Sequence, residues 1–374
     1  PAPPAGGTQD VVSNFYQSPQ HLEHHPHFWY PGDSSDADSI RLDDNIKGLP
    51  TYGNSDFGIV KELFSINSRP TEQFDIVHQH GIWMPMSLYS MKIRKQADLK
   101  TVIQPHGLLE PFRLNISKYK KKLAFWLFER LNLHNATTLI ACSENEALNL
   151  KTMFPKHDVA VISNGIDPDF FNAPSLKYSE SETKKSILFL SQIIPLKGLE
   201  RLFRVIADIG IDHFDGWEFI IAGYGDEKYL NLLKRIVSDL NLNSIISFVG
   251  KKLGQEKLEV FDNATFFILP TFNENFGIVV AEALARGLPV ITTRGTPWEE
   301  LNKYNCGLCV DNTEDGLKSA LLKVLSQSET KIVEMKLNGR RLIAEKYLWD
   351  RTTLKTIDLY KWILHGDTKP DFII

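Results

Sequence analysis

The stretch "TFNENFGIVVAEALARGLPVITT", residues 271–293, places a polar loop, an apolar helix and a β-branched run in direct succession. The six residues before it, "TFFILP" (265–270), form a short and continuously apolar run, which predicts a buried strand. The helix is predicted to run from about Phe276 to Arg286, and Gly287 is suited to end it because glycine readily adopts a left-handed backbone. This order of elements is typical of a parallel α/β sheet.

Two acids, Glu274 in the loop and Glu282 in the apolar helix, stand eight residues apart. Open α/β sheets bind ligands outside the carboxyl ends of their strands, and a helix N-terminus there favours an anion such as phosphate. Eight residues at about 1.5 Å each separate the acids by roughly 12 Å. Carboxylates accept hydrogen bonds from hydroxyl groups, so this length suits a nucleotide sugar, with hydroxyls at both ends and a diphosphate between them.

Similar apolar runs alternate with helical patterns along most of the chain, which predicts parallel sheets covered on both faces. A first series of strands is expected at 74–80, 101–106, 137–143 and 159–163. A second series is expected at 186–191, 217–223, 245–250, 265–270 and 288–292. Helices are expected at Leu199–Ala207, Lys228–Leu240 and Gly316–Leu325, and a polar surface linker at 173–186. The sequence therefore predicts two α/β sheets joined near "SNGID" (163–167).

Composition limits the class of protein. A chain of 374 residues with 43% hydrophobic and 24% charged residues is expected to form two ordinary globular domains. A net charge of -4 gives no reason to expect a nucleic-acid partner. We expect a cytoplasmic protein, because the sequence offers neither a signal-peptide core nor an apolar run of the roughly 18 residues that span a bilayer. Cys306 and Cys309 form a CxxC without further ligands nearby, so a structural role is favoured and no metal site is expected.

The chain opens with "PAPPAGGTQDVVSNF" (1–15), a Pro/Gly-rich loop that runs into a helical pattern. A doubly wound sheet normally begins with a strand, followed by a glycine-rich loop at a helix N-terminus. The interpretation favoured here is that this first strand is missing from the sequence. The alternative is that the first domain begins unusually.

Several ordered motifs give the chain a family resemblance. In the second half these are "VISNGID" (161–167), "FLSQIIPLKGLERL" (189–202), "IAGYGDE" (221–227), "SFVGKKL" (247–253) and the E-x7-E of Glu274 and Glu282. In the first half they are "DIVHQHGIW" (75–83), "QPHGLLEPF" (104–112) and "ACSENE" (141–146). Together they resemble the retaining GT-B glycosyltransferases of the glycogen-synthase-like and sucrose-synthase-like group, over nearly the whole chain.

The resemblance implies an α/β GT-B fold, in which two Rossmann-like domains face each other across a cleft. It assigns residues 1–165 to an N-terminal, acceptor-side domain and residues 166–345 to a C-terminal, donor-side domain. Residues 346–374 are expected to form a closing helix that packs back on the first domain. The motif that indicates this is "EKYLWDRTTLKTIDLY" (345–360).

The resemblance also implies roles for particular residues. Glu274 matches the acid that contacts the donor sugar, and Glu282 matches the acid that holds the ribose hydroxyls. Lys197 matches the lysine that neutralises the departing diphosphate, and His106 matches a histidine near the reacting carbon. The implied catalytic residues are therefore His106, Lys197 and Glu274. The implied donor-binding residues are Gly7 (in the Gly6–Gly7 loop), Gln192, Gly223, Asn275, Phe276, Gly277 and Glu282, and no metal ligand is implied.

The implied reaction is transfer of a hexose-type sugar with retention at its anomeric carbon. The donor would be a nucleotide diphosphate sugar, with uridine the favoured base, and the acceptor a glycan or a lipid-linked sugar in bacterial cell-surface polysaccharide or glycolipid synthesis. Neither a cofactor nor a metal is expected, because a cation and a helix N-terminus would stabilise the leaving group.

Gln192 departs from the family pattern, because an arginine usually stands at this position beside the lysine. A glutamine donates a hydrogen bond but brings no charge, which weakens stabilisation of a diphosphate. A catalytically weak nucleotide-sugar-binding protein therefore stays open as an alternative. A second alternative is a GT-B sugar-nucleotide epimerase, which the E-x7-E context disfavours. A milder departure is Ser163, where the family commonly has proline.

Two further features have competing interpretations. His78 and His80 alternate along an expected strand, where core histidines with hydrogen-bond partners are favoured over ligands. The helical segment "SKYKKKLAFWLFERLNL" (117–133) combines lysines with Leu and Trp residues. It is either an ordinary amphipathic helix on the first sheet or a surface for an anionic membrane that carries the acceptor.

Overall fold

A computed structural model describes Val12, Phe15 and residues 23–31, 46–52, 59–64, 73–172 and 185–374. The chain forms two compact units. Unit 1 contains Pro1–Gly165 together with Trp349–Ile374, and unit 2 contains Ile166–Leu348. The expected linker lies outside the described residues from 173 to 184, as does the Gly6–Gly7 loop.

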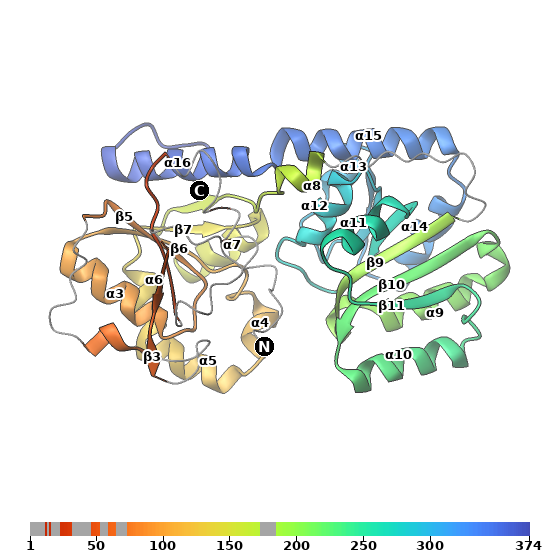
Figure 1. Cartoon of the computed structure of the whole chain (residues 1–374), viewed down its shortest axis with the longest axis horizontal. Helices are drawn as coiled ribbons and strands as arrows, with labels where there is room; N and C mark the ends of the chain where they lie inside the picture. Colours follow the sequence, from red (N-terminus) through yellow and green to blue (C-terminus); the bar gives the residue numbers. More distant parts are fainter. Residues whose placement is uncertain are drawn as a thin grey trace. The chain divides into compact units, whose positions relative to one another are not determined.

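Unit 1 is built on a parallel four-stranded sheet in the order β5 (Ile76–His80), β6 (Lys100–Gln104), β7 (Thr138–Ala141) and β8 (Val159–Val161) (Figure 1). Strands β5, β7 and β8 fall within the runs predicted from the sequence, and β6 begins one residue before its predicted run. Apolar side chains of the sheet pack against those of the helices, among which Ile103, Leu133, Leu139 and Leu150 are fully buried. The helices of this half of unit 1 are α3 (Met86–Ala97), α4 (Pro111–Asn115), α5 (Lys118–Ala124), the π-helix η3 (Phe125–Glu129), α6 (Arg130–His134) and α7 (Glu144–Met153).

The last helix, α16 (Trp349–His365), belongs to unit 1 although it follows unit 2 in the chain (Figure 1). Its Leu359 packs with Val102, Ile140 and Ala160 of the sheet. The final residues extend this packing, because Ile373 forms an antiparallel bridge with Ala160. Helix α16 thus packs on the sheet of unit 1, and it begins at Trp349.

The first part of unit 1 contributes two small sheets. β1 (Phe28–Pro31) pairs in parallel with β2 (Ile46–Leu49), and β3 (Thr51–Tyr52) pairs antiparallel with β4 (Ile59–Val60), which the 3-10 helix η2 (Lys61–Phe64) follows. Val12 and Phe15 are helical. The region in which a first strand was expected to be missing lies outside the described residues.

Unit 2 contains a six-stranded parallel sheet in the order β11-β10-β9-β12-β13-β14. The strands are β9 (Lys185–Ile193), β10 (Trp217–Gly225), β11 (Ile246–Gly250), β12 (Phe266–Leu269), β13 (Val290–Thr293) and β14 (Gly307–Val310). The apolar runs of β9, β12 and β13 are buried because helices cover both faces of a doubly wound sheet, whereas β11 at the edge is largely exposed. The CxxC cysteines are free, buried thiols around β14, and burial raises the pKa of Cys306 to about 12 and of Cys309 to about 11.

The helices of unit 2 follow the predicted pattern with small shifts. They are α8 (Pro168–Asn172), η4 (Pro195–Lys197), α9 (Leu199–Ile209), η5 (Ile211–Phe214), α10 (Glu227–Asp239), α11 (Gly254–Asp262), α12 (Ile278–Ala285), α13 (Glu300–Lys303), α14 (Glu314–Leu325) and α15 (Glu329–Lys346). In α12 the helix begins two residues later than predicted, because Gly277 at φ +76° is its N-cap. Gly287, at φ +71°, follows its last turn as predicted. Within the described part of the chain, the helices are too short or too polar to cross a membrane.

Candidate functional site

The strand order of unit 2 reverses between β9 and β12, which are neighbours in the sheet. Strands β10 and β11 extend from one side of β9, and β13 and β14 extend from the far side of β12. In doubly wound sheets, such a reversal opens a crevice at the carboxyl ends of the two strands, where ligands bind. Lys197 follows β9 and Glu274 follows β12, so the fold itself brings these two predicted residues to the same place.

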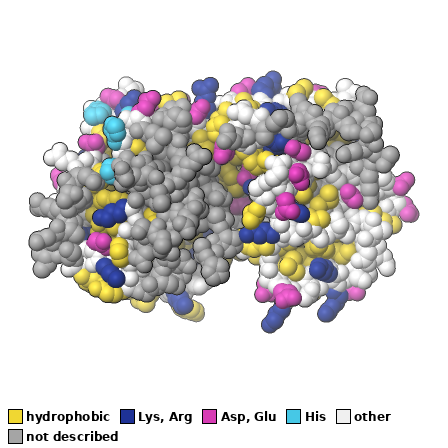
Figure 2. Space-filling view, viewed as in Figure 1, with side chains coloured by type: hydrophobic (Ala, Val, Ile, Leu, Met, Phe, Trp, Pro, Cys, Tyr) yellow, Lys and Arg dark blue, Asp and Glu magenta, His cyan; other side chains and the backbone are white. Residues whose placement is uncertain are grey.

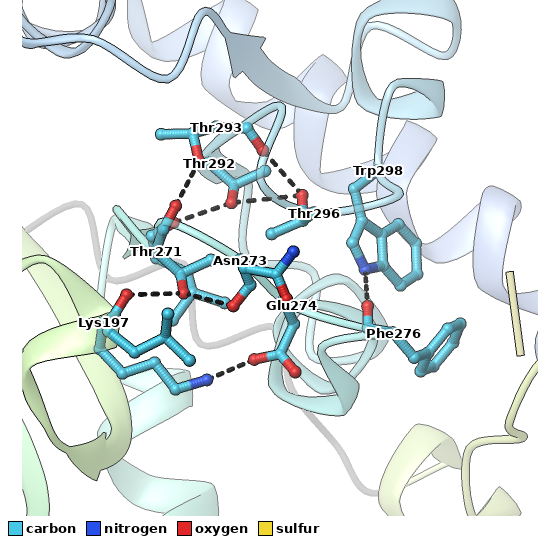
Figure 3. A network of polar contacts seen from close by, with 11 residues as sticks. Lys197, Thr271, Asn273, Glu274, Phe276, Thr292, Thr293, Thr296 and Trp298 are labelled. Carbon is cyan, nitrogen blue, oxygen red and sulfur yellow. Dashed lines mark hydrogen bonds and ion pairs between the residues drawn. The ribbon is translucent and has the colours of Figure 1, made fainter. Parts of the chain in front are cut away.

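Lys197 and Glu274 form an ion pair in which both side chains are largely shielded from water (Figure 3). The backbone places the lysine closely, because it ends the 3-10 helix η4 and is followed by Gly198 at φ +74°. A Cβ at Gly198 would lie 2.1 Å from the Pro270 carbonyl oxygen, so only glycine lets the two loops meet. The pair therefore depends on a close contact between the ends of β9 and β12.

The loop that carries Glu274 is fixed by hydrogen bonds from its neighbours (Figure 3). The Thr271 hydroxyl donates to the Leu196 carbonyl at 3.1 Å, and the Phe272 amide donates to the same carbonyl at 2.9 Å. On the other side, the Thr293 hydroxyl donates to the Thr271 carbonyl at 2.6 Å, and the Glu274 amide donates to the Gly295 carbonyl at 2.6 Å. The loop is thus held between the ends of β9 and β13 before any ligand binds.

The N-terminus of α12 faces the same loop. The Trp298 indole donates to the Phe276 carbonyl at 2.5 Å, and the rings of these two residues pack at 5.3 Å (Figure 3). Gly277 turns the chain into α12, and no described side chain caps its first turn, so the first amides can donate to an anion. The Asn275 Oδ1 atom is buried and lacks a hydrogen-bond partner among the described residues. Backbone amides can donate hydrogen bonds to a phosphate, and a side-chain amide oxygen can accept one from a sugar hydroxyl.

Glu282 has a partner that the sequence did not indicate. Lys257 of α11 lies 2.6 Å from its Oε1 atom, and the two side chains are 25% and 14% exposed. The Lys257 ammonium also lies 5.6 Å from the ring centroid of Phe170. Glu282 is therefore paired with a different lysine from the one that pairs with Glu274. The sequence around Lys257 shows only an amphipathic helix, and it gives no signal of which residue the lysine would meet.

Gln192 and Gly223 lie at the carboxyl ends of β9 and β10. Gln192 is exposed and pairs in register with Tyr224, and the Lys251 ammonium lies 5.2 Å from the Tyr224 ring centroid. A Cβ at Gly223 would lie 1.9 Å from the Ser191 carbonyl oxygen, so glycine is required there. A lysine that directly follows β11 therefore contacts the Tyr224 ring, and Tyr224 is the register partner of Gln192.

His106 belongs to unit 1, where it follows β6 at φ +54°. Its Nε2 atom lies 3.0 Å from Nδ1 of His80, and its Nδ1 atom lies 3.8 Å from Sγ of Cys142. Burial lowers the pKa of His106 to about 4, so its imidazole is neutral at neutral pH. Within unit 2 the structure brings together Lys197, Glu274 and the residues that begin α12, whereas Gly7 lies outside the described residues.

Comparison with protein families gives one match for each half of the chain. Residues 5–170 match the model described as Glycosyltransferase Family 4, and residues 175–341 match the model described as Glycosyl transferases group 1. The chain belongs to the group 1 glycosyltransferases. The family resemblance predicted from the E-x7-E and its accompanying motifs is thereby confirmed.

Individual relatives of this glycosyltransferase are distant. An uncharacterized glycosyltransferase of Methanocaldococcus jannaschii is 27% identical over 252 residues, which are 64% of this chain and 63% of the relative. This match therefore spans less than two thirds of that relative's length.

Solved structures share the fold over almost the full chain. Sucrose-phosphate synthase from Thermosynechococcus elongatus aligns with a TM-score of 0.73 at 19% identity, covering 97% of this chain and 95% of the other. HepE from Anabaena in complex with UDP aligns with a TM-score of 0.73 at 14% identity, covering 95% and 96%. The predicted GT-B fold class is confirmed.

Proposed function

We propose that this group 1 glycosyltransferase moves a hexose-type sugar from a nucleotide diphosphate sugar to a glycan or lipid-linked acceptor, with retention at the anomeric carbon. The observation that carries the proposal is the Lys197–Glu274 pair at the strand reversal of unit 2, in front of the N-terminus of α12. At one site, the cation and the helix amides can bind a diphosphate while the carboxylate binds the hydroxyls of a sugar.

Each group in this site has a distinct role in the proposal. Lys197 and the amides of Asn275, Phe276 and Gly277 stabilise the negative charge of the leaving diphosphate. Glu274 accepts hydrogen bonds from the sugar as positive charge develops on its ring. Glu282, held by Lys257, receives the ribose hydroxyls. The family resemblance further assigns His106 of unit 1 to the reacting sugar. It assigns Gly7, which lies outside the described residues, to the phosphate or the acceptor.

UDP is the favoured nucleotide, and the structural likeness to HepE, which was solved with UDP, is consistent with that choice. Lys197 and the helix N-terminus already provide positive charge for the diphosphate, so the proposal requires neither a metal nor a cofactor. By the same family resemblance, the acceptor belongs to bacterial cell-surface polysaccharide or glycolipid synthesis.

Product analysis tests the proposal against the two alternatives. UDP-, GDP- and ADP-sugars are incubated with the full chain, with and without an acceptor, and the products are examined by NMR. Transfer that needs an acceptor and keeps the anomeric configuration supports the proposal. Isomerised donor without acceptor identifies an epimerase, and binding without turnover identifies the weak binding protein that Gln192 suggests.

We also propose that the acceptor side of the enzyme works at a cytoplasmic membrane face. Support comes from an exposed apolar stripe along α5, η3 and α6, in which Tyr119, Leu123, Trp126, Leu127 and Leu131 are 55–86% exposed. Four lysines, at positions 118 and 120–122, lie on α5. Figure 2 shows hydrophobic and basic side chains together along the lower edge of unit 1, where Figure 1 places α5. Apolar and basic groups side by side suit an anionic lipid surface.

Vesicle sedimentation distinguishes this arrangement from an ordinary solvated helix. The full chain is expected to sediment with vesicles that contain phosphatidylglycerol and not with pure phosphatidylcholine. The double variant Trp126→Ser, Leu127→Ser should abolish sedimentation, whereas Leu232→Ser, an exposed leucine of α10 in unit 2, should leave it unchanged. Equal binding by all three proteins would contradict the membrane proposal.

A further inference from the structure

A column of aromatic side chains runs through unit 1 to His106. It begins on α16, where the Tyr360 hydroxyl lies 2.6 Å from Nδ1 of His78. The rings of His78 and His80, two residues apart on β5, stack at 4.1 Å with an angle of 25°. His80 then stacks on His106 at 5.3 Å and 20°. Successive side-chain contacts therefore connect α16 with the loop after β6, through Tyr360, His78, His80 and His106 in that order.

The His80–His106 contact is a hydrogen bond as well as a stack. His80 Nδ1 and His106 Nε2 are 3.0 Å apart, so one of them donates and the other accepts. A neutral imidazole carries its single proton on one nitrogen, and the partner of the other nitrogen determines which one. His106 is neutral at neutral pH because burial lowers its pKa to about 4. His80 is therefore placed to decide which nitrogen of His106 carries the proton.

The backbone at His106 needs such support. A non-glycine residue at φ +54° is strained, and strained residues persist where their surroundings hold them firmly. The next residue, Gly107, is held by the carboxylate of Glu146, which accepts its amide at 2.6 Å and the Cys142 amide at 2.7 Å. These bonds fix the backbone of the loop. The ring of His106 is oriented by His80 and by the weaker contact with Cys142.

His80 is itself held in place from several directions. His78 covers one face of its ring, and the ring of Phe15 lies 5.7 Å away. On the far side of His78, burial raises the pKa of Tyr360 above its ordinary value, so the residue remains a phenol that can hydrogen-bond to His78. We propose that His80 is a positioning residue, which fixes the tautomer and the ring orientation of His106. The proposal rests on the proposed function for the catalytic role of His106.

Ring NMR of histidine-labelled full chain tests the positioning role without relying on turnover. In the wild-type protein, His106 is expected to show one tautomer at neutral pH. His80→Phe keeps an aromatic ring and removes the hydrogen bond, so the His106 signals should become those of a tautomer mixture. His80→Asn places an amide near the former Nδ1 position and should keep a single tautomer. His213→Phe, which changes an exposed histidine of unit 2, should leave the His106 signals unchanged.

Kinetics supply the second readout. His80→Phe should lower kcat about tenfold or more with little change in the donor KM, and His80→Asn should restore at least part of the loss. Unchanged His106 signals in His80→Phe would overturn the positioning role. If His80→Phe does not fold, His80→Asn decides the matter, because mixed tautomers in a folded His80→Asn protein would overturn it equally. Failure of the proposed function looks different: the tautomers would respond as expected, but no protein in the series would transfer sugar.

Discussion

Glu274 and Glu282 each have a lysine partner, yet the two acids stand in different chemical positions. Glu274 pairs with Lys197 in the loop where the strand order reverses, and Glu282 pairs with Lys257 on the side of α12. A group that meets only the unreacting part of a donor contributes equally to substrate and transition-state binding. A group that meets the reacting sugar contributes more to the transition state. Neutral substitutions of the two acids are therefore expected to change different kinetic constants.

Glu274→Gln should lower kcat more than it raises the donor KM. It should not weaken binding of the nucleotide diphosphate, because it releases Lys197 from its ion pair. Glu282→Gln should chiefly raise KM, since the proposed ribose contact would be the same before and during reaction. Titration calorimetry with the nucleotide diphosphate and steady-state kinetics with the sugar nucleotide measure both effects. Loss of diphosphate binding in Glu274→Gln with retention in Glu282→Gln would mean that the donor lies the other way round.

Gln192→Arg tests whether a positive charge is missing at the end of β9. Gln192 is exposed there, and a charge-assisted hydrogen bond contributes about 1.5–3 kcal/mol in favourable settings. Binding of the nucleotide diphosphate or turnover should therefore rise roughly tenfold. Asn231→Arg adds the same charge on the exposed side of α10 and should change neither quantity. No effect of Gln192→Arg would indicate that another cation already serves the phosphate, and Lys251, beside the Tyr224 ring, is one candidate.

At the scale of single elements, α12 depends on the glycine that begins it. Gly277→Ala would force alanine to φ +76°, which costs about 1–2 kcal/mol, and its Cβ would lie 3.1 Å from Cγ of Glu274. We expect a fall in melting temperature of roughly 2–8 °C together with a loss of kcat. Gly216→Ala is the matched control, because Gly216 has φ +73° and open space around it. It should lose stability to a similar extent and keep its activity, so equal kcat in both variants would contradict the role of this turn.

The elements were largely predictable because buried parallel strands appear in the sequence as continuous apolar runs. Deviations have local causes: β6 ends at Gln104 rather than at position 106, since Pro105 has no amide proton and His106 adopts positive φ. The partners across elements were not predictable. Lys257 and Glu282 are 25 residues apart, and His80 and His106 are 26 apart. A helical or alternating pattern shows which face is buried, but not which neighbour covers it.

At the scale of the whole molecule, ligand binding should stabilise one unit more than the other. A ligand at about 100 times its Kd stabilises the native state by about 2.7 kcal/mol. For a unit of the size of Ile166–Leu348 this corresponds to roughly 5–10 °C. In scanning calorimetry, UDP should raise the transition of unit 2, and the shift and the transferase activity should both persist in excess EDTA. Loss of either in chelator, with recovery on adding magnesium or manganese, would contradict metal-independent action.

The return of α16 to unit 1 has a consequence for how the chain is made. Unit 2 is continuous from Ile166 to Leu348, so all of its strands have been synthesised before Trp349 is added. Unit 1 is interrupted, because the helix that covers Val102, Ile140 and Ala160 is translated after unit 2. On the ribosome, the half of the protein that begins first is therefore the half that is completed second. Until α16 has been synthesised, one face of this sheet stays open to water and to whatever chaperone reaches it first.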